Sequence, residues 1–332
     1  MEAGREEKAE DLLDIRNLKV TFPGRDKIVR AVDGLSLTLR RGEIYGLIGE
    51  SGSGKSVTAL SIMRLLNAHA RIEADWIKLM GRDLLLLTEA EMRKIRGNKI
   101  SIIFQDPMTS LNPSMTVGKQ IEESLMIHQG MPAQTARMKA CEMMEMVAIP
   151  DPKTSSKRFP HEFSGGMRQR VMISMALCCN PHLLIADEPT TALDVTVQAQ
   201  ILELLKKLVL RLQTSVLLIT HDFGVVAELC DRVSVIYGGE IVEHAPTQTI
   251  LNDPRHPYTI GLLDCIIPPD KDKAELEIIP GAPPDPKHFP TGCKFHPRCK
   301  SAREKCSNEI PRFRQVNGNH LVRCSATREE WK

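Results

Sequence analysis

A glycine-rich loop that directly follows a short apolar strand restricts the fold of this chain more than any other feature. Residues 44–48 predict a buried strand and residues 56–67 predict a helix. The segment between them fits the pattern G-x-x-x-x-G-K-[ST], and a strand, a glycine loop and a helix in this order form a phosphate-binding loop. A glycine-rich turn that binds nothing is the weaker interpretation in this context. The loop consists of Gly49, Glu50, Ser51, Gly52, Ser53, Gly54, Lys55 and Ser56.

The residue types in this loop fit the chemistry of a nucleotide. Glycines allow backbone N–H groups to turn inward onto phosphate oxygens. Lys55 reaches the β- and γ-phosphates, and Ser56 supplies a hydroxyl to Mg²⁺. Downstream, the apolar run 183–186 predicts a buried strand that ends in Asp187 and Glu188. Two acids at a strand end are most often a solvated turn. After a phosphate loop, however, we expect Asp187 to hold Mg²⁺ through water and Glu188 to polarise an attacking water, so ATP hydrolysis is predicted.

Apolar strands alternate with helices over most of the first 250 residues, which predicts a parallel α/β core covered on both faces. Segment 12–39 alternates apolar and polar residues instead, which predicts antiparallel strands with a turn at 23–26. Past Pro254 the periodicity fades, so we place a domain boundary near residue 250. Helices are predicted over 88–96, 116–128, 132–147, 165–179 and 197–213, and strands over 100–104, 183–186 and 216–220.

Composition excludes several other classes of protein. The chain has 42% hydrophobic and 26% charged residues, as expected for a globular protein that buries a core without disulfides. A net charge of +2 and 4% aromatic residues argue against nucleic acid as a partner. No run approaches the ~18 apolar residues that span a bilayer, and the N-terminus lacks a signal peptide. We therefore expect a cytosolic protein; if it works at a membrane, other chains must hold it there.

A second helix begins with a serine and two glycines, Ser164, Gly165 and Gly166, and such an N-terminus binds anions. One chain has only one γ-phosphate to bind, so this second site needs an explanation. The three residues resemble the signature motif of the ATP-binding-cassette (ABC) superfamily, which contacts nucleotide held by the phosphate loop of a partner subunit. Phe163 and Met167 stand where the common motif has leucine and glutamine.

The resemblance extends over roughly residues 12–250 and implies further roles. Gln105 is similar to the Q-loop glutamine that senses Mg²⁺ and the attacking water, and Asp194 to the D-loop residue at the dimer interface. His221 matches the switch histidine that contacts the γ-phosphate. Phe22 lies where the family stacks an aromatic ring on adenine, although packing within a strand is a rival role.

The same resemblance implies an α/β fold of the P-loop NTPase class. Its ABC-type domain would span 12–250, with a RecA-like parallel-sheet core, an antiparallel β subdomain and a helical subdomain at about 106–178. A small Cys-rich extension would follow at 251–332. Residues 105–113, 256–259 and 280–299 narrow the resemblance to the ATPase subunits of oligopeptide, dipeptide and nickel importers.

An ATPase that powers import of di- or oligopeptides is therefore implied, with nickel or glutathione import as the alternative. A soluble cassette ATPase acting on DNA or ribosomes is the alternative from another class. DNA-repair members split the cassette with long coiled coils or zinc modules, and translation factors fuse two cassettes in one chain; neither feature is evident in this sequence. A second alternative is a regulatory or binding module whose ATP site is catalytically inactive. The intact set of Lys55, Asp187, Glu188 and His221 argues against it.

Four of the nine cysteines lie within the short polar tail: Cys293, Cys299, Cys306 and Cys324. A cytosolic protein rarely forms disulfides, so this cluster indicates metal. The spacings lack the tight C-x₂₋₄-C pairs of zinc sites, and four thiolates suit a [4Fe–4S] cluster such as related importer ATPases carry. Zinc and unligated thiols remain the alternatives. His296 lies between two of the cysteines but is not needed as a ligand.

The resemblance also implies partners for the chain. Two ATPase subunits would close head to tail over two ATP molecules, and the second would be a paralogous ABC ATPase in a heterodimer. Two transmembrane permease subunits would dock on the helical subdomain and on residues 105–113, with an extracytoplasmic substrate-binding protein beyond them. No nucleic acid is expected. The protein would lie at the cytoplasmic face of the plasma (inner) membrane as a peripheral subunit, and its substrate is set by the other chains.

Overall fold

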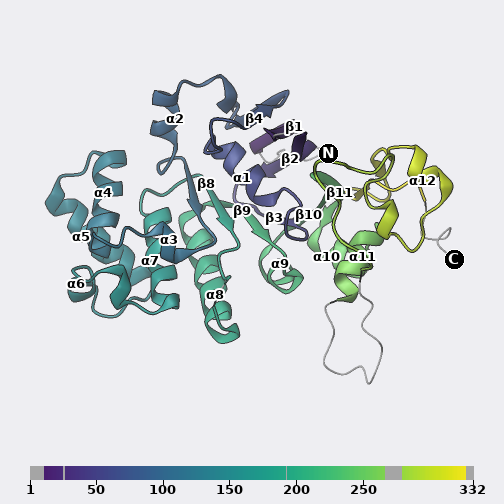
Figure 1. Ribbon diagram of the computed structural model, residues 1–332. Coiled ribbons are helices and arrows are strands. Elements are labelled where there is room, and N and C mark those ends of the chain that lie inside the picture. Colours follow the sequence, from purple (N-terminus) through teal and green to yellow (C-terminus); the bar gives the residue numbers. More distant parts are fainter. Residues whose placement is uncertain (1–10, 25–26, 192, 266–278, 327–332) are drawn as a thin grey trace, which may run out of the picture. The chain divides into compact units, whose positions relative to one another are not determined.

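The computed structural model describes residues 11–24, 27–191, 193–265 and 279–326 (Figure 1). These residues form two compact units, each made from several segments of the chain. The first unit comprises residues up to 14, 38–43 and 77–217, and the second comprises 15–37, 44–76 and 218 onward. Four strands have residues in both units: β1 (Asp11–Pro23), β2 (Ile28–Arg40), β5 (Trp76–Leu79) and β9 (Ser215–Thr220).

The first unit contains two parallel strands at its centre, β7 (Ile100–Ile103) and β8 (Leu183–Asp187). Ile100 lies opposite Leu183, and every residue of β8 is buried. Parallel strands require a crossover between them, and here the chain between β7 and β8 is helical. The predicted parallel α/β arrangement is confirmed for this pair.

The helices between β7 and β8 pack on one another as a group in Figure 1. Helix α7 contacts α4, α5 and β7, so it joins the helical group to the strand pair. Thr116 occupies the N-cap of α4, and the buried side chains Ile121 and Leu125 form its apolar face. The helices are α3 (Pro107–Ser110), α4 (Val117–Gln129), α5 (Ala133–Met146), α6 (Pro152–Ser155) and α7 (Gly165–Leu177), and α8 (Val195–Leu212) follows β8.

Smaller elements of the first unit precede β7. Strand β5 (Trp76–Leu79) pairs antiparallel with β6 (Arg82–Asp83), and the turn η1 (Leu84–Leu86) follows. Helix α2 (Glu89–Ile95) begins as predicted at Thr88, whose hydroxyl accepts from the Glu91 N–H. The Glu91 carboxylate in turn accepts from the Thr88 N–H, which completes a capping box.

The second unit is built on a sheet with the strand order β12-β13-β11-β10-β3. Strand β10 (Arg232–Tyr237) is parallel to β3 (Ile44–Ile48) and antiparallel to β11 (Glu240–Pro246). Strands β12 (Arg314–Gln315) and β13 (Leu321–Val322) come from the C-terminal extension, and β13 pairs with β11. The extension therefore adds strands to the same sheet that contains β3, the strand that leads into the phosphate-binding loop.

Six helices or helical turns of the second unit are described, together with β4 (Arg71–Glu73), which is antiparallel to β1. Helix α9 packs against β3 and α10, and α10 against β10 and β11. None of the helices in the described residues is long and apolar enough to cross a membrane. The helical segments are α1 (Lys55–Met63), α9 (Phe223–Leu229), α10 (Thr247–Asn252), α11 (Pro257–Asp264), η3 (His296–Arg298) and α12 (Glu304–Asn308), and the first unit adds η2 (Pro160–Glu162).

The structure differs from the sequence prediction at helix α1 and at the hairpin β10–β11, among other places. Helix α1 ends at Met63 rather than near Asn67, because Arg64 takes a left-handed conformation with φ of 50° and turns its N–H back onto Leu60 and Ser61. The hairpin β10–β11 was not predicted at all. Its two-residue loop, Gly238-Gly239, has positive φ at both positions, which is a turn that glycine pairs favour.

Candidate functional site

The glycines of the phosphate-binding loop are required by its backbone geometry. Gly52 and Gly54 have φ of 77° and 106°, which other residues adopt only with strain. A Cβ atom at Gly49 would overlap the carbonyl oxygen of Ile236 on β10. The loop therefore runs tightly against β10 and enters α1 directly from the left-handed Gly54.

Lys55 is folded back over this loop. Its Nζ donates to the carbonyl oxygens of Gly49 at 2.6 Å and Glu50 at 2.9 Å, and the residue is only 5% exposed. Ser56 is exposed in the first turn of α1. The hydroxyl of Ser53 is buried and has no hydrogen-bond partner in the described residues. A cationic loop with an unsatisfied hydroxyl is suited to an anion such as a phosphate group.

In the first unit, the ends of the parallel strands β7 and β8 bring Gln105 and Glu188 together. The Gln105 Nε2 donates to the Glu188 Oε2 at 3.0 Å, and the Thr191 hydroxyl donates to the same oxygen at 3.0 Å. Glu188 has φ of 46°, a left-handed conformation that is uncommon for non-glycine residues. Asp187, the preceding residue, is buried at the end of β8.

The signature-like residues and Asp194 occupy two neighbouring helix N-termini of the same unit. Ser164 is the N-cap of α7, and its hydroxyl accepts from the Met167 N–H. Asp194 is the N-cap of α8, and its carboxylate accepts from the Val197 N–H at 3.0 Å. A Cβ at Gly166 would lie 2.7 Å from the Val197 side chain, so glycine permits close packing of α7 on α8.

The predicted site residues are divided between the two units. Those of the first unit are Gln105, Ser164, Gly165, Gly166, Asp187, Glu188 and Asp194, and those of the second are Phe22, His221 and the loop from Gly49 to Ser56. Phe22 is half-buried near the end of β1, and His221 is exposed after β9. Ala192, the first residue of the D-loop-like segment, lies outside the described residues.

Two contacts of the loop involve residues that the sequence gave no reason to connect with it. Arg298, in the C-terminal extension, forms a bidentate ion pair with the Glu50 carboxylate at 2.6 and 3.0 Å. The hydroxyl of Tyr258 accepts from the Glu50 backbone N–H at 2.9 Å. These pairs are separated by 248 and 208 positions, so no local pattern could have predicted them.

The four cysteines of the extension line one small cavity of about 20 Å³. All four are free thiols, and burial together with the neighbouring thiols raises the pKa of Cys293 and of Cys299 to about 11 each. Thiols that converge on one cavity fit the donor set of a metal or cluster. The described residues nonetheless contain no group of three or more metal-ligating side chains arranged to hold a metal ion. The His296 Nδ1 lies 3.0 Å from the Cys293 carbonyl oxygen.

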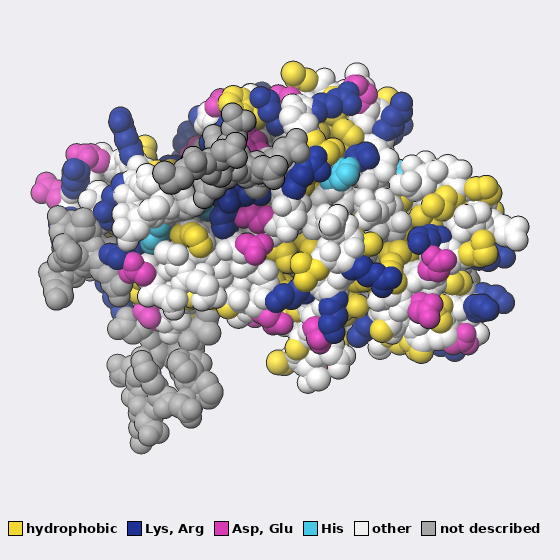
Figure 2. Space-filling view, turned by 180° about the vertical axis from the view of Figure 1, so that it is seen from behind, with side chains coloured by type: hydrophobic (Ala, Val, Ile, Leu, Met, Phe, Trp, Pro, Cys, Tyr) yellow, Lys and Arg dark blue, Asp and Glu magenta, His cyan; other side chains and the backbone are white. Residues whose placement is uncertain are grey.

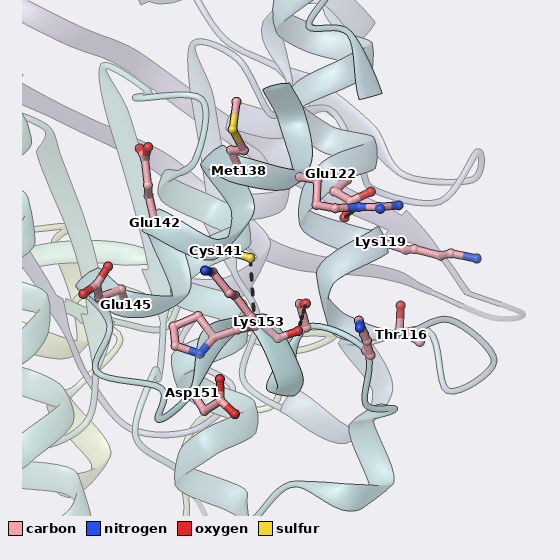
Figure 3. Close-up of a pocket in the computed structure, with 13 residues that line it drawn as sticks. Thr116, Lys119, Glu122, Met138, Cys141, Glu142, Glu145, Asp151 and Lys153 are labelled. Atoms are coloured by element: carbon pink, nitrogen blue, oxygen red, sulfur yellow. Dashed lines mark hydrogen bonds and ion pairs between the residues drawn. The ribbon is translucent and has the colours of Figure 1, made fainter. Parts of the chain in front are cut away.

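A separate open cavity of about 910 Å³ lies among α4, α5 and α6 of the first unit (Figure 3). It is lined by charges of both signs, including Lys119, Glu122 and Glu145, and by the exposed Met138. The Cys141 thiol lies 4.0 Å from the Pro152 carbonyl oxygen on its wall. None of the predicted ATP-site residues lines this cavity.

The chain matches two protein-family models. The first, described as ABC transporter, covers residues 32–191, and the second, described as oligopeptide/dipeptide transporter, C-terminal region, covers residues 242–306. Among solved structures, a dimeric bacterial ABC transporter cassette, MJ0796, is similar, with a TM-score of 0.63 and 29% identity. That similarity covers 71% of this chain and 98% of the cassette. It confirms the predicted ABC-type α/β fold.

Curated relatives extend the similarity over nearly the whole chain. The oligopeptide transport ATP-binding protein OppD of Haemophilus influenzae is 49% identical over 96% of this chain and 98% of its own length. The dipeptide transport ATP-binding protein DppD of Bacillus subtilis is 48% identical over 95% and 94%. The chain therefore belongs to the ABC transporter family, as an ATP-hydrolysing subunit of the type found in oligopeptide and dipeptide transporters.

Proposed function

We propose that this chain powers the import of di- or oligopeptides across the cytoplasmic membrane. The observation that carries the proposal is the match of residues 242–306 to the C-terminal region of oligopeptide/dipeptide transporters, in a chain whose relatives are named for peptide transport along its whole length. A nickel or glutathione importer would use the same ATPase chemistry. Identifying the transported molecule would distinguish peptide import from these two alternatives.

For hydrolysis we propose in-line attack of water on the γ-phosphate, with Glu188 as the general base. The hydrogen bonds from Gln105 and Thr191 support this role, because they fix the carboxylate at the end of β8. Ser56, Asp187 and Gln105 would hold Mg²⁺, which neutralises phosphate charge. Lys55 and His221 would stabilise the charge that develops on the γ-phosphate, and Phe22 would stack on adenine.

A complete site requires a second ATPase subunit in this proposal. Ser164, Gly165 and Gly166 lie at a helix N-terminus that attracts anions, and they would contact the ATP bound by the partner's loop. Asp194, the N-cap of α8, would lie beside that ATP at the dimer interface. The similar cassette MJ0796 is described as dimeric, which supports a two-subunit arrangement. We propose a paralogous ATPase as the partner, and hence a heterodimer.

The permease subunits would dock on the helical part of the first unit, at the cytoplasmic face of the inner membrane. Figure 2 shows hydrophobic side chains among acidic and basic ones over this part of the molecule. Ile127 and Met138 are 68% and 57% exposed there, and Met138 lines the cavity of Figure 3. Exposed apolar side chains beside a cavity that is also lined by charged groups are suited to a protein segment rather than to a small ion. A substrate-binding protein outside the membrane would deliver the peptide.

Transport by the assembled complex tests this function. The chain, its permease subunits, the second ATPase and the binding protein are reconstituted in vesicles, and uptake of labelled tripeptide, Ni²⁺ and glutathione is measured with ATP. We expect only the peptide to accumulate, and accumulation should stop when Lys55→Ala replaces the parent chain. Uptake of Ni²⁺ or glutathione in place of peptide would assign the alternative substrate.

For the extension we propose a [4Fe–4S] cluster held by Cys293, Cys299, Cys306 and Cys324, with zinc as the alternative. Their convergence on one cavity supports the proposal, and the role would be structural, since the extension has few regular elements of its own. Iron and acid-labile sulfide are measured after anaerobic purification. About four of each per chain is expected, whereas a colourless protein that contains zinc would overturn the proposal.

A further inference from the structure

Glu50, the second residue of the phosphate-binding loop, is held at both its backbone and its side chain. The hydroxyl of Tyr258 accepts from its N–H, and its carbonyl oxygen accepts from Lys55 Nζ at 2.9 Å and from the Ser53 N–H at 3.2 Å. Its carboxylate is paired with both Nη atoms of Arg298. The orientation of this one residue therefore affects the position of the Lys55 ammonium group and the curvature of the loop.

Arg298 is itself fixed in place, which makes it an effective support for Glu50. Its side chain is 6% exposed, its Nε donates to the Pro280 carbonyl oxygen at 2.9 Å, and its guanidinium lies over the Tyr237 ring. The ion pair with Glu50 raises the pKa of Arg298, so the charge is kept. A bidentate arginine–carboxylate pair gives directional as well as electrostatic support.

Further residues beside the phosphate-binding loop also follow residue 250, outside the ABC-type domain predicted from the sequence. Tyr258, on α11, is fully buried, and its ring packs against Tyr237 and Phe295 with centroids 4.6 and 5.4 Å apart. Pro283 and Pro284 of the extension lie beside Ser51 and Gly52 along one small cavity. The extension thus covers one side of the phosphate-binding loop.

We propose that Arg298 is a positioning residue for ATP binding, which holds the phosphate-binding loop in its binding shape through Glu50. The C-terminal extension is then part of the nucleotide site and not only a separate module. The inference rests on the assignment of residues 49–56 as the ATP phosphate site. Arg298 also ends the short turn η3, which lies between Cys293 and Cys299. A change at the cysteine cavity that moves this turn would therefore also move Arg298 and, through it, the phosphate-binding loop.

The test compares binding of a fluorescent ATP analogue, with Mg²⁺, to full-length variants. Arg298→Gln and Glu50→Gln should each raise Kd about tenfold, since a loop that must be ordered on binding loses affinity. The double variant should show no further rise, because both substitutions remove the same interaction. Arg298→Lys should recover part of the affinity, and hydrogen exchange of segment 49–56 should be faster in Arg298→Gln. Arg312→Gln, an exposed arginine of the same extension, is the matched control.

Each outcome bears on the inference. If Arg298→Gln lowers only the thermal midpoint while the folded protein keeps the parental Kd, the residue is structural and the inference is wrong. If Arg298→Gln does not fold, the partly exposed Glu50→Gln decides, and a parental Kd in that variant overturns the proposal. A parent chain that fails to bind the analogue would show that the loop assignment is itself wrong, and the inference falls with it.

Discussion

The side-chain amide of Gln105 donates a hydrogen bond to the carboxylate of Glu188, with 3.0 Å between Nε2 and Oε2. The two residues stand 83 positions apart and meet because β7 and β8 are parallel, so their carboxyl ends lie at the same edge. The Thr191 hydroxyl donates to the same oxygen. Two donors hold the carboxylate in one orientation at the end of β8.

Glu188→Gln should keep ATP binding and lose phosphate release. The amide preserves the shape of the carboxylate but cannot accept a proton, and loss of a general base lowers kcat by about 100-fold or more. Phosphate release by the assembled complex and binding of the fluorescent ATP analogue are the two measurements. Glu203→Gln, at an exposed position on α8, is the control and should hydrolyse ATP normally. Parental hydrolysis by Glu188→Gln would show that the base assignment is wrong.

Glu243→Ala should destabilise the second unit strongly. The Glu243 carboxylate is fully buried and accepts from the backbone N–H groups of Arg255 and His256 and from the His320 ring at 2.7 Å. Removing it leaves these donors buried without an acceptor, which costs about 3–5 kcal/mol. Urea unfolding measures the change.

The matched control for this variant is Glu309→Ala, at an exposed ion pair with Lys305, which should change stability by less than about 1 kcal/mol. Glu243→Gln should fall between the two, because its amide oxygen still accepts hydrogen bonds. Equal unfolding midpoints for Glu243→Ala and Glu309→Ala would contradict the proposed importance of this buried network.

Cys299→Ser should remove iron from the extension and weaken ATP binding together. The serine hydroxyl is a poor substitute for a thiolate ligand, and residue 299 directly follows Arg298, so a displaced turn weakens the support of Glu50. Iron content and the Kd of the fluorescent analogue are measured on the same anaerobic sample. Cys265→Ser, at an exposed cysteine outside the cavity, should change neither. Loss of iron with an unchanged Kd would show that the cysteine cavity does not affect nucleotide binding by the loop.

Acidification should destabilise the helical part of the first unit through His128. Burial lowers the pKa of this histidine below its ordinary value of 6.5, so the unfolded chain binds the proton more tightly than the folded protein. The contribution is therefore fully present above about pH 6.5 and is lost as the pH falls from there through the lower pKa of the folded protein. Thermal midpoints at pH 7.5 and 5.5 should differ less in His128→Gln than in the parent. His69→Gln, at an exposed position, should behave like the parent.

The chemistry of the ATP site was predictable because its signals are local. Gly49 to Ser56 follow one strand and open one helix, and Asp187 and Glu188 end another strand, so spacing within a few residues predicts both motifs. The longer helices of the first unit were predicted from local patterns too, and the capping residue Thr88 lies beside the residues that it caps.

The strands of the C-terminal extension were beyond such prediction. Its strands are two residues long, which is too short to show an alternating pattern, and they exist because β13 pairs with β11. The hairpin β10–β11 does carry one local signal, the pair Gly238-Gly239 between two apolar runs, which is typical of a two-residue hairpin turn.

The sequence by itself determined that the chain binds nucleotide phosphate, that acidic residues end a buried strand, and that four thiols occur in one tail. Only the tertiary structure decided that those thiols share a cavity and that Arg298 reaches Glu50 across 248 positions. The physical reason is that a motif depends on backbone geometry over a few residues. A buried ion pair between distant segments depends on how the whole sheet and its extension pack, and no local pattern records that packing.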